Sequence, residues 1–271
     1  MKSNQNVQYK SQPQNFVRKV MPKPTLVLKQ QTKTEPAPIP SINAKELEIL
    51  QMVLEMRYMT LRQITKKFYL VSSTVADKSA QYTVKKLLEQ GLLKTKDAEI
   101  GSESLLVPTL KAYSALAGKY PEAKLPQIQK NIFQPRVKHD LLLNKLRIRF
   151  EELGFLNKWY SETMVEEIPF FKRQFADLPD AVCKKKNEKG YFLELEVSMK
   201  STKVYAARIE EYLRILALEE INDAGIEGAV FFCTDEKVRD KIKEQIPEGV
   251  KSISALLYES YFPSKAKPGG K

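Results

Sequence analysis

The stretch that decides the fold is FLELEVSMK, which occupies residues 192–200. Side chains along a β-strand alternate between its two faces, so Glu194 and Glu196 share one face and the leucines beside them share the other. A strand at the centre of an α/β sheet is normally apolar on both faces. Two carboxylates on one face are costly unless they bind a cation, pair with lysine or meet water in a cleft. The stretch therefore predicts an acidic site on a central strand.

A third carboxylate is predicted to join this site. Asp180 lies on the preceding strand, which a short turn at residues 186–190 pairs with residues 190–200. Three converging carboxylates suit Mg²⁺ or Mn²⁺, and such a metal can activate water and orient a phosphodiester. Lys200 or Lys203 would stabilise the charge that develops on the phosphate. The alternative is a set of structural ion pairs between the glutamates and nearby lysines, namely Lys185, Lys186, Lys200 or Lys203.

The elements around this strand predict an α/β domain over residues 137–262. Hydrophobic periodicity indicates helices at 138–154, 202–223 and 236–245. Strands are expected at 158–167, 179–184, 190–200 and 228–234, with a possible edge strand at 252–256. The order is α-β-β-β-α-β-α-β, which makes the chain α+β as a whole once the preceding helical part is included.

The part before it, residues 41–118, has the order of a winged helix-turn-helix domain. An amphipathic helix is expected at 44–57 and a second at 60–68, where Thr60 and Gln63 match a capping box. A third helix is expected at 79–90, closed by Gly91. Two short strands, 92–96 and 104–108, follow around a turn at 101–102, and a further helix covers 109–118.

In a winged helix the third helix enters the major groove and the hairpin contacts the adjacent backbone. The polar side chains of the third helix and the lysines of the first hairpin strand are therefore the DNA-binding candidates: Gln81, Tyr82, Lys85, Lys86, Lys94 and Lys96. A winged helix can also serve only to bind another protein, and this alternative stays open.

Charge and composition favour a polyanionic partner. The net charge is +12, and lysine and arginine neutralise phosphates and release counterions. Much of the excess lies in residues 1–40, a proline- and glutamine-rich basic tail expected to be disordered, and the segments 119–136 and 263–271 are expected to be a linker and a second tail. A solubility role for the lysines is the alternative. No run of about 18 apolar residues or secretory signal occurs, so we expect a cytoplasmic protein without membrane insertion.

Several chemistries are excluded by residue counts. One histidine and two cysteines cannot form the usual cysteine–histidine zinc site, and Cys183 and Cys233 are expected to be buried thiols. A single histidine also cannot supply the histidine cluster that the commoner tyrosine relaxases use. No Walker-type phosphate loop is present, so ATPase activity is not expected.

Five motifs in order resemble the replication-relaxation family, which includes the MobC-like relaxases of mobilisable plasmids. After the winged helix come VKHDLLLN at 137–144, WYSE at 159–162, PDAV at 179–182, and Glu194-Leu195-Glu196 followed by a basic helix. The α-β-β-β-α-β order with Asp180 after Pro179 also resembles the PD-(D/E)xK nucleases. The sequence departs from that pattern at Glu196, where a lysine is usual. The match at the helix start makes His139 and Asp140 further site candidates.

The resemblance implies a metal-dependent relaxase that nicks double-stranded plasmid DNA at an origin of transfer or replication. It also implies an accessory relaxosome protein and a coupling protein as partners. Two alternatives are a non-catalytic replication or transcription regulator with a degenerate nuclease domain, and a restriction-type endonuclease that cuts both strands. Nicking at one position of a supercoiled plasmid would distinguish the relaxase from both.

Overall fold

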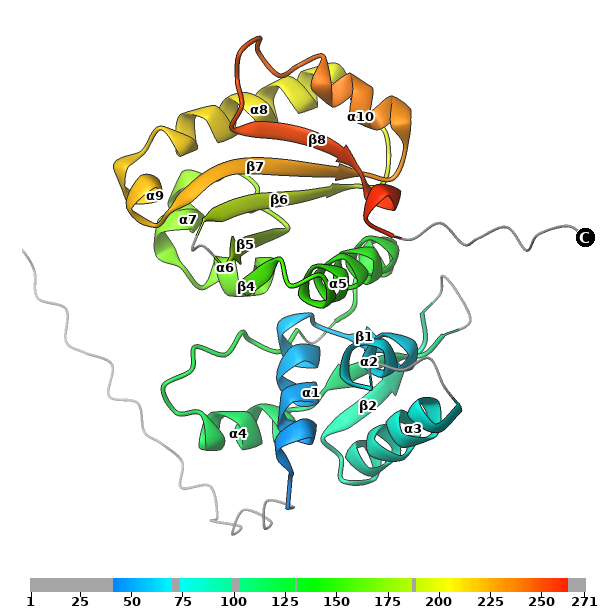
Figure 1. Cartoon of the computed structure of the whole chain (residues 1–271). Coiled ribbons are helices and arrows are strands. Elements are labelled where there is room, and N and C mark those ends of the chain that lie inside the picture. Colours follow the sequence, from blue (N-terminus) through cyan, green and yellow to red (C-terminus); the bar gives the residue numbers. More distant parts are fainter. Residues whose placement is uncertain (1–40, 70–73, 99–102, 130, 187–188, 263–271) are drawn as a thin grey trace, which may run out of the picture. The chain divides into compact units, whose positions relative to one another are not determined.

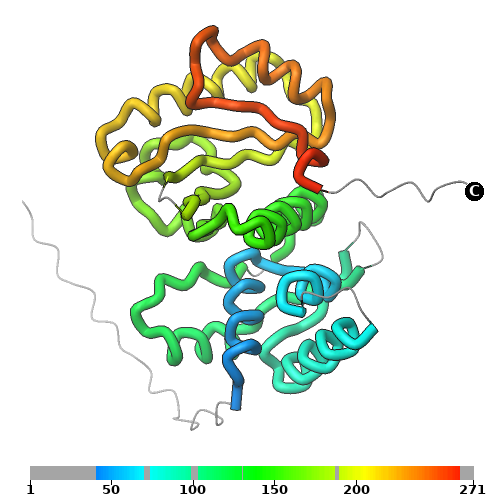
Figure 2. Tube along the Cα trace, viewed as in Figure 1, coloured from blue at the N-terminus to red at the C-terminus, as the bar shows by residue number. Residues whose placement is uncertain are grey.

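The structure, a computed structural model, describes residues 41–69, 74–98, 103–129, 131–186 and 189–262. The predicted tails at 1–40 and 263–271 lie outside these residues, and so do the turn at 101–102 and positions 187–188 of the turn at 186–190. The chain completes a mostly helical first half before it enters an α/β second half (Figure 1, Figure 2).

The first half contains three helices followed by a hairpin, in the predicted order. The helices are α1 (Ala44–Glu55), α2 (Leu61–Phe68) and α3 (Thr74–Glu89), and α4 (Leu110–Lys119) follows the hairpin. The hairpin strands β2 (Leu93–Lys96) and β3 (Leu105–Pro108) are antiparallel, and β1 (Met59–Thr60) pairs with the other edge of β3. The strand β1 was not predicted, because two residues are too few to show a period.

Local signals explain most helix ends in this half. Thr60 and Gln63 form the predicted capping box, with each side chain accepting a hydrogen bond from the other residue's backbone N–H. Gly91 closes α3 with a positive φ of 65°, as predicted. The start of α3 was predicted too late, near Ser79, because residues 72–77 are mostly polar. In the structure the helix begins at Thr74. Its first turns can be polar because they are exposed, and among them only Ala76 is buried.

The second half is a five-stranded mixed sheet in the order β4-β5-β6-β7-β8 (Figure 1). Both β4 and β6 are antiparallel to β5, which lies between them, and β6, β7 and β8 are parallel. The strand bounds are β4 (Leu156–Ser161), β5 (Ala181–Lys185), β6 (Gly190–Glu196), β7 (Ile226–Cys233) and β8 (Ile253–Leu257). The strand at 252–256 was predicted to be an edge strand, and β8 is one.

Helices cover both faces of this sheet. They are α5 (Val137–Glu152), α6 (Glu162–Glu166), α7 (Pro169–Gln174), α8 (Thr202–Leu216), α9 (Glu219–Asp223) and α10 (Glu236–Lys243), with short 3₁₀ turns η1 (Gln134–Arg136) and η2 (Tyr258–Tyr261). The helix α5 lies on one face, and α8 and α10 lie on the other (Figure 1). The result is a sheet between two helical layers, with β6 as its central strand.

Four predicted elements of the second half differ from the structure. The strand at 179–184 begins only at Ala181, so Asp180 lies just before β5 and not on it. The strand at 158–167 ends at Ser161, because residues 162–166 form a helical turn and Pro169 starts another helix. The strand at 190–200 ends at Glu196, so Ser198 and Lys200 lie in the following loop. The helix at 202–223 is two helices, because Leu218 adopts an extended backbone that interrupts it.

The predicted alternation along β6 is confirmed, and it places the glutamates. Leu193 and Leu195 belong to the apolar cluster on the α5 face. Phe192 packs on the opposite face against the aromatic rings of α7 and α8, and Glu194 and Glu196 follow it at spacings of two. The two carboxylates therefore face α8 at the carboxyl end of the central strand.

The close approach between β7 and the chain that enters β8 requires glycine at position 228. A Cβ atom at Gly228 on β7 would lie 2.2 Å from the backbone oxygen of Ser252. That oxygen accepts a hydrogen bond of 2.8 Å from the N–H of Ala229, which starts the pairing of β7 with β8. Only glycine allows the chain entering β8 to come this close to β7.

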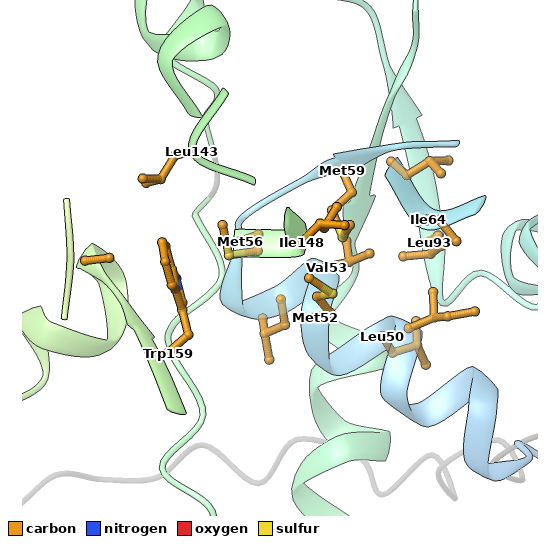
Figure 3. Close-up of a cluster of buried hydrophobic side chains, with 14 of the residues drawn as sticks. Leu50, Met52, Val53, Met56, Met59, Ile64, Leu93, Leu143, Ile148 and Trp159 are labelled. Atoms are coloured by element: carbon orange, nitrogen blue, oxygen red, sulfur yellow. The ribbon is translucent and has the colours of Figure 1, made fainter. Parts of the chain in front are cut away.

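One apolar cluster joins the two halves of the chain. Met52, Val53, Met56 and Met59 of the first half lie in the same cluster as Trp159 of β4 (Figure 3). Side chains of α5, among them Leu143 and Ile148, complete the contact. The predicted boundary at 119–136 stays a prediction, but the residues on either side of it bury one another's apolar surface.

Candidate functional site

A cleft of about 740 Å³ opens where the carboxyl end of β6 meets the start of β5, α5 and α8. Five of the predicted site residues line it: His139, Asp180, Glu194, Glu196 and Lys200. A sixth candidate, Asp140, does not line the cleft but contacts His139. Lys203 is exposed on the first turn of α8 and is not among the lining residues, so of the two predicted lysines only Lys200 lies at the cleft.

Asp180 is the most fully bonded of the three predicted metal ligands. Its Oδ2 accepts a hydrogen bond of 2.8 Å from the backbone N–H of Leu195 and lies 3.0 Å from Nε2 of His139. Its Oδ1 accepts one of 3.2 Å from Arg136. Burial opposes ionisation, but these partners outweigh it and lower the pKa of Asp180. Asp180 is therefore an ionised carboxylate, and its side chain ties the residue that precedes β5 to the backbone of β6.

Glu194 lies against the inward face of α8. Its Oε1 accepts hydrogen bonds from the guanidinium of Arg208, one of them 3.0 Å from Nε, and from the hydroxyl of Tyr212. Burial raises the pKa of Glu194 to about 7, although the charge of Arg208 opposes the shift. A carboxyl group that titrates near neutrality can exchange a proton at physiological pH.

Glu196 has a different cationic partner. Its Oε1 accepts a hydrogen bond of 2.8 Å from the ammonium of Lys200, four residues further on. Burial raises the pKa of Glu196, and Lys200 opposes the rise. The cation beside Glu196 is thus Lys200, which lines the cleft and whose side chain is about half exposed.

His139 bridges two aspartates at the start of α5. Nδ1 lies 3.2 Å from Oδ1 of Asp140, and Nε2 lies 3.0 Å from Oδ2 of Asp180. Burial alone would lower the pKa of His139, but its hydrogen bonds to the two carboxylates and their charges raise it to about 10. The imidazole is therefore protonated at neutral pH and donates to both aspartates.

An ionic network links this corner of the cleft to the first half of the chain. Arg57, just after α1, lies 2.6 Å from Glu162 and 3.4 Å from Asp140. Arg136 contacts the same two carboxylates, at 2.6 Å and 3.1 Å. The hydroxyl of Tyr58 donates a buried bond of 2.7 Å to Asp140. Two residues between α1 and β1 therefore help to hold Asp140, one of the two aspartates that bind His139.

To bind Mg²⁺ or Mn²⁺, Asp180, Glu194 and Glu196 would have to direct free carboxylate oxygens to one point. Among the described residues, no three histidine, cysteine, aspartate or glutamate side chains are grouped so that they could hold a metal ion. Each predicted ligand binds a cationic side chain instead: Asp180 binds Arg136 and His139, Glu194 binds Arg208, and Glu196 binds Lys200. As arranged here, Asp180, Glu194 and Glu196 do not fit Mg²⁺ or Mn²⁺.

The DNA-binding candidates of the first half lie in different surroundings. Gln81, Tyr82, Lys85 and Lys94 are exposed, and the ring of Tyr82 is 73% exposed. Lys86 instead lies 2.7 Å from the buried carboxylate of Glu46 on α1. Lys96 on β2 is partly buried. The structure thus separates exposed side chains of α3 from Lys86, which helps to hold α3 against α1.

Two arginines of the cleft were not predicted from the sequence. Arg208 lies on the stripe of α8 that also carries the buried Tyr205, Ile209 and Tyr212. An arginine on the apolar stripe of an amphipathic helix indicates a buried ion pair, so the sequence of α8 contains the pattern from which Arg208 could have been predicted. Arg136 gave a weaker signal, because it lies in a proline-punctuated segment. Only its i,i+4 pair with Asp140 is local, and its other partners, Glu162 and Asp180, come from the tertiary fold.

The fold and the cleft define a class of protein: a helical half with a hairpin joined to an α/β half whose central strand carries paired carboxylates. A family model described as Replication-relaxation matches residues 50–228, more than half of the chain. The chain belongs to this family. The matched region runs from α1 into β7 and contains every candidate residue named above. No curated protein matches the chain. None of the described helices combines the length and apolar composition needed to cross a bilayer.

Proposed function

We propose that this protein acts on plasmid DNA during replication and relaxation, as a relaxase that binds the duplex with its first half and cuts one strand at the cleft. Membership of the Replication-relaxation family supports the plasmid role. The cleft is proposed as the active site because five candidate residues from three separate motifs line this one cavity.

Relaxation of a closed circular plasmid has a topological requirement. Its linking number cannot change unless at least one strand is broken. A protein of plasmid relaxation therefore either cuts DNA or recruits a protein that does. Hydrolysis of one phosphodiester adds water across a P–O bond and leaves one phosphate end and one hydroxyl end. The cleft of the second half is the place in this chain with carboxylates, a protonated histidine and guanidinium groups together.

The first half is proposed to be a winged helix that positions the duplex. Three helices and an antiparallel hairpin follow the order of that fold. The outward face of α3 exposes Val75, Lys78, Tyr82 and Lys85, all opposite its buried stripe. Lysines there suit phosphates, and the exposed apolar groups suit base edges in the major groove.

In the second half, the residues of the cleft have separable tasks. Lys200 and Arg136, the more exposed cations, would bind the phosphate to be cut. Glu194, with a pKa near neutrality, would accept a proton from the attacking water, and His139 would stay charged beside the phosphate. The predicted Mg²⁺ or Mn²⁺ has no fitted place in this arrangement, and the carboxylates would have to leave Arg208 and Lys200 to bind one.

The test is a nicking assay on a supercoiled plasmid that carries the DNA flanking the protein's own coding sequence. Reactions contain Mg²⁺, Mn²⁺ or EDTA, and the products are open circles, linear DNA or unchanged plasmid. Open circles nicked at one mapped position are expected. Linear product would support the restriction-type alternative, and specific binding without any cutting would support the non-catalytic regulator. An accessory relaxosome protein and a coupling protein remain proposed partners.

A further inference from the structure

The rim of the cleft carries an aromatic ring that the chain does not bury. Phe133 lines the cleft, and its side chain is 70% exposed. Its neighbours are anchored on both sides. Ile132 packs on a buried cluster that includes Tyr58, and the N–H of Arg136 donates a bond of 2.9 Å to the Phe133 carbonyl. The ring is therefore held at the rim by an ordered backbone, although most of its surface stays exposed among the residues that the structure describes.

Other apolar side chains gather at the same cleft. Val204, on the first turn of α8, lines it and is 48% exposed. Leu178 and Val197, both partly buried, also line it. Exposed apolar groups that collect at the mouth of a polar cleft indicate a ligand with an apolar surface.

The distribution of charges in the cleft indicates where the charged groups of that ligand would lie. Asp180, Glu194 and Glu196 on the floor repel phosphate groups. The more exposed cations are Lys200 and Arg136, whose side chains are 49% and 32% exposed. A polyanion would therefore keep its phosphates near these two residues and turn its uncharged parts toward the apolar rim.

We propose that the cleft binds an unpaired DNA strand and that Phe133 stacks on one of its bases. This inference rests on the proposed action on DNA and specifies the form of the substrate. Aromatic rings and cationic side chains together are how proteins hold single strands, because every base offers a flat face to stack on. In an intact duplex these faces are covered by neighbouring bases, so the ring at the rim could not stack on the bases of a paired strand.

The experiment measures binding by fluorescence anisotropy with two probes. One is a fluorescein-labelled oligothymidine of about 16 nucleotides, the upper end of the usual site size. The other is a blunt duplex with the plasmid's flanking sequence. The full chain is compared with Phe133→Ala, with Phe133→Trp, which keeps a stacking ring, and with the control Phe155→Ala. Phe155 is also about half exposed, at 48%, but lines a different cavity on the other face of the sheet.

Phe133→Ala should weaken binding of the oligothymidine about tenfold, which is the loss of affinity expected when one base loses its stacking partner. Phe133→Trp should bind within about twofold of the wild type, Phe155→Ala should be unchanged, and duplex affinity should not depend on Phe133. Equal affinity of Phe133→Ala and wild type for the oligothymidine would overturn the inference. A wild type that binds the duplex alone would overturn it and leave the proposed function standing, whereas binding of neither probe would refute both.

Discussion

At the scale of single residues, the least ordinary position is Arg57. It is the one non-glycine residue in the described part of the chain with a positive φ, at 67°. A side chain in this region costs about 1–2 kcal/mol, because Cβ crowds the backbone. The arginine stays there because its guanidinium reaches Glu162 and Asp140 of the other half. Strain at this position is thus offset by two ion pairs next to the cleft.

The first prediction compares two substitutions of Arg57. Arg57→Ala removes both ion pairs and keeps the crowded Cβ, so it should lower the free energy of unfolding by about 2 kcal/mol. Arg57→Gly removes the same pairs but relieves the crowding, and should retain about 0.5–1 kcal/mol more than alanine. Urea denaturation measures the difference. An alanine variant more stable than the glycine variant would show that the backbone at position 57 is not left-handed in solution.

The second prediction concerns protonation of His139. Its folded pKa of about 10 lies above the ordinary value of 6.5, so its contribution to stability is complete below about 6.5 and is lost as pH rises toward 10. The chain has one histidine, so one imidazole signal in a proton NMR spectrum reports it directly. The signal should not titrate between about pH 6 and 8.5. A midpoint near 6.5 would mean that the bridge to Asp140 and Asp180 does not form.

At the scale of elements, the lysines of α3 lie on two different faces of the helix. Its inner stripe packs into the core, and Lys86 at the edge of that stripe binds Glu46 of α1. Its outer face presents Lys85, which is 76% exposed and forms only a long contact with Glu89. Two adjacent lysines that look alike in the sequence therefore have different roles.

The third prediction separates these two lysines by their salt dependence. Lys85→Ala should lower the slope of log affinity against log salt by about one unit, because one phosphate contact is lost. Lys86→Ala should leave that slope unchanged and instead lower the free energy of unfolding by about 1 kcal/mol, because Glu46 loses its partner. Duplex binding at several salt concentrations, together with urea denaturation, measures both. A steeper salt effect at Lys86 than at Lys85 would place the other face of α3 on the DNA.

Elements also show what the sequence could and could not predict. The alternation along β6 placed Glu194 and Glu196 on one face correctly, because a period of two depends only on the strand itself. The extent of a strand depends on its partners, so the predicted strand at 158–167 overran Ser161 into a helix. The ion pairs of Arg136 with Glu162 and Asp180 require the folded chain, and no local pattern could reveal them, whereas its pair with Asp140 has an i,i+4 spacing that the sequence contains.

At the scale of the whole molecule, the two halves share apolar and ionic contacts. The cluster of α1 and β1 with α5 and Trp159 is continuous (Figure 3). Arg57 extends the contact to Glu162, which lines the cleft. A duplex held by α3 would therefore be held at a fixed position relative to the cleft. This rigidity suits a protein that cuts at one place.

The fourth prediction follows from the shared core. The only tryptophan of the chain, Trp159, is 5% exposed and lies in that core, so its fluorescence reports separation of the halves. Its thermal transition should coincide with loss of secondary structure followed by circular dichroism, since both halves unfold together. A fluorescence change well before the loss of secondary structure would show two independent domains.

The cleft beside β6 is proposed to be the place where the DNA strand is cut. The most direct measurement is the nicking rate of Glu194→Gln on the supercoiled plasmid, compared with Glu166→Gln, which alters an exposed glutamate of α6 outside the cleft. We predict that Glu194→Gln loses about a hundredfold or more of the rate, the usual contribution of a proton-transferring group, while Glu166→Gln nicks like the wild type. Equal nicking by wild type and Glu194→Gln, with both folded, would contradict the account.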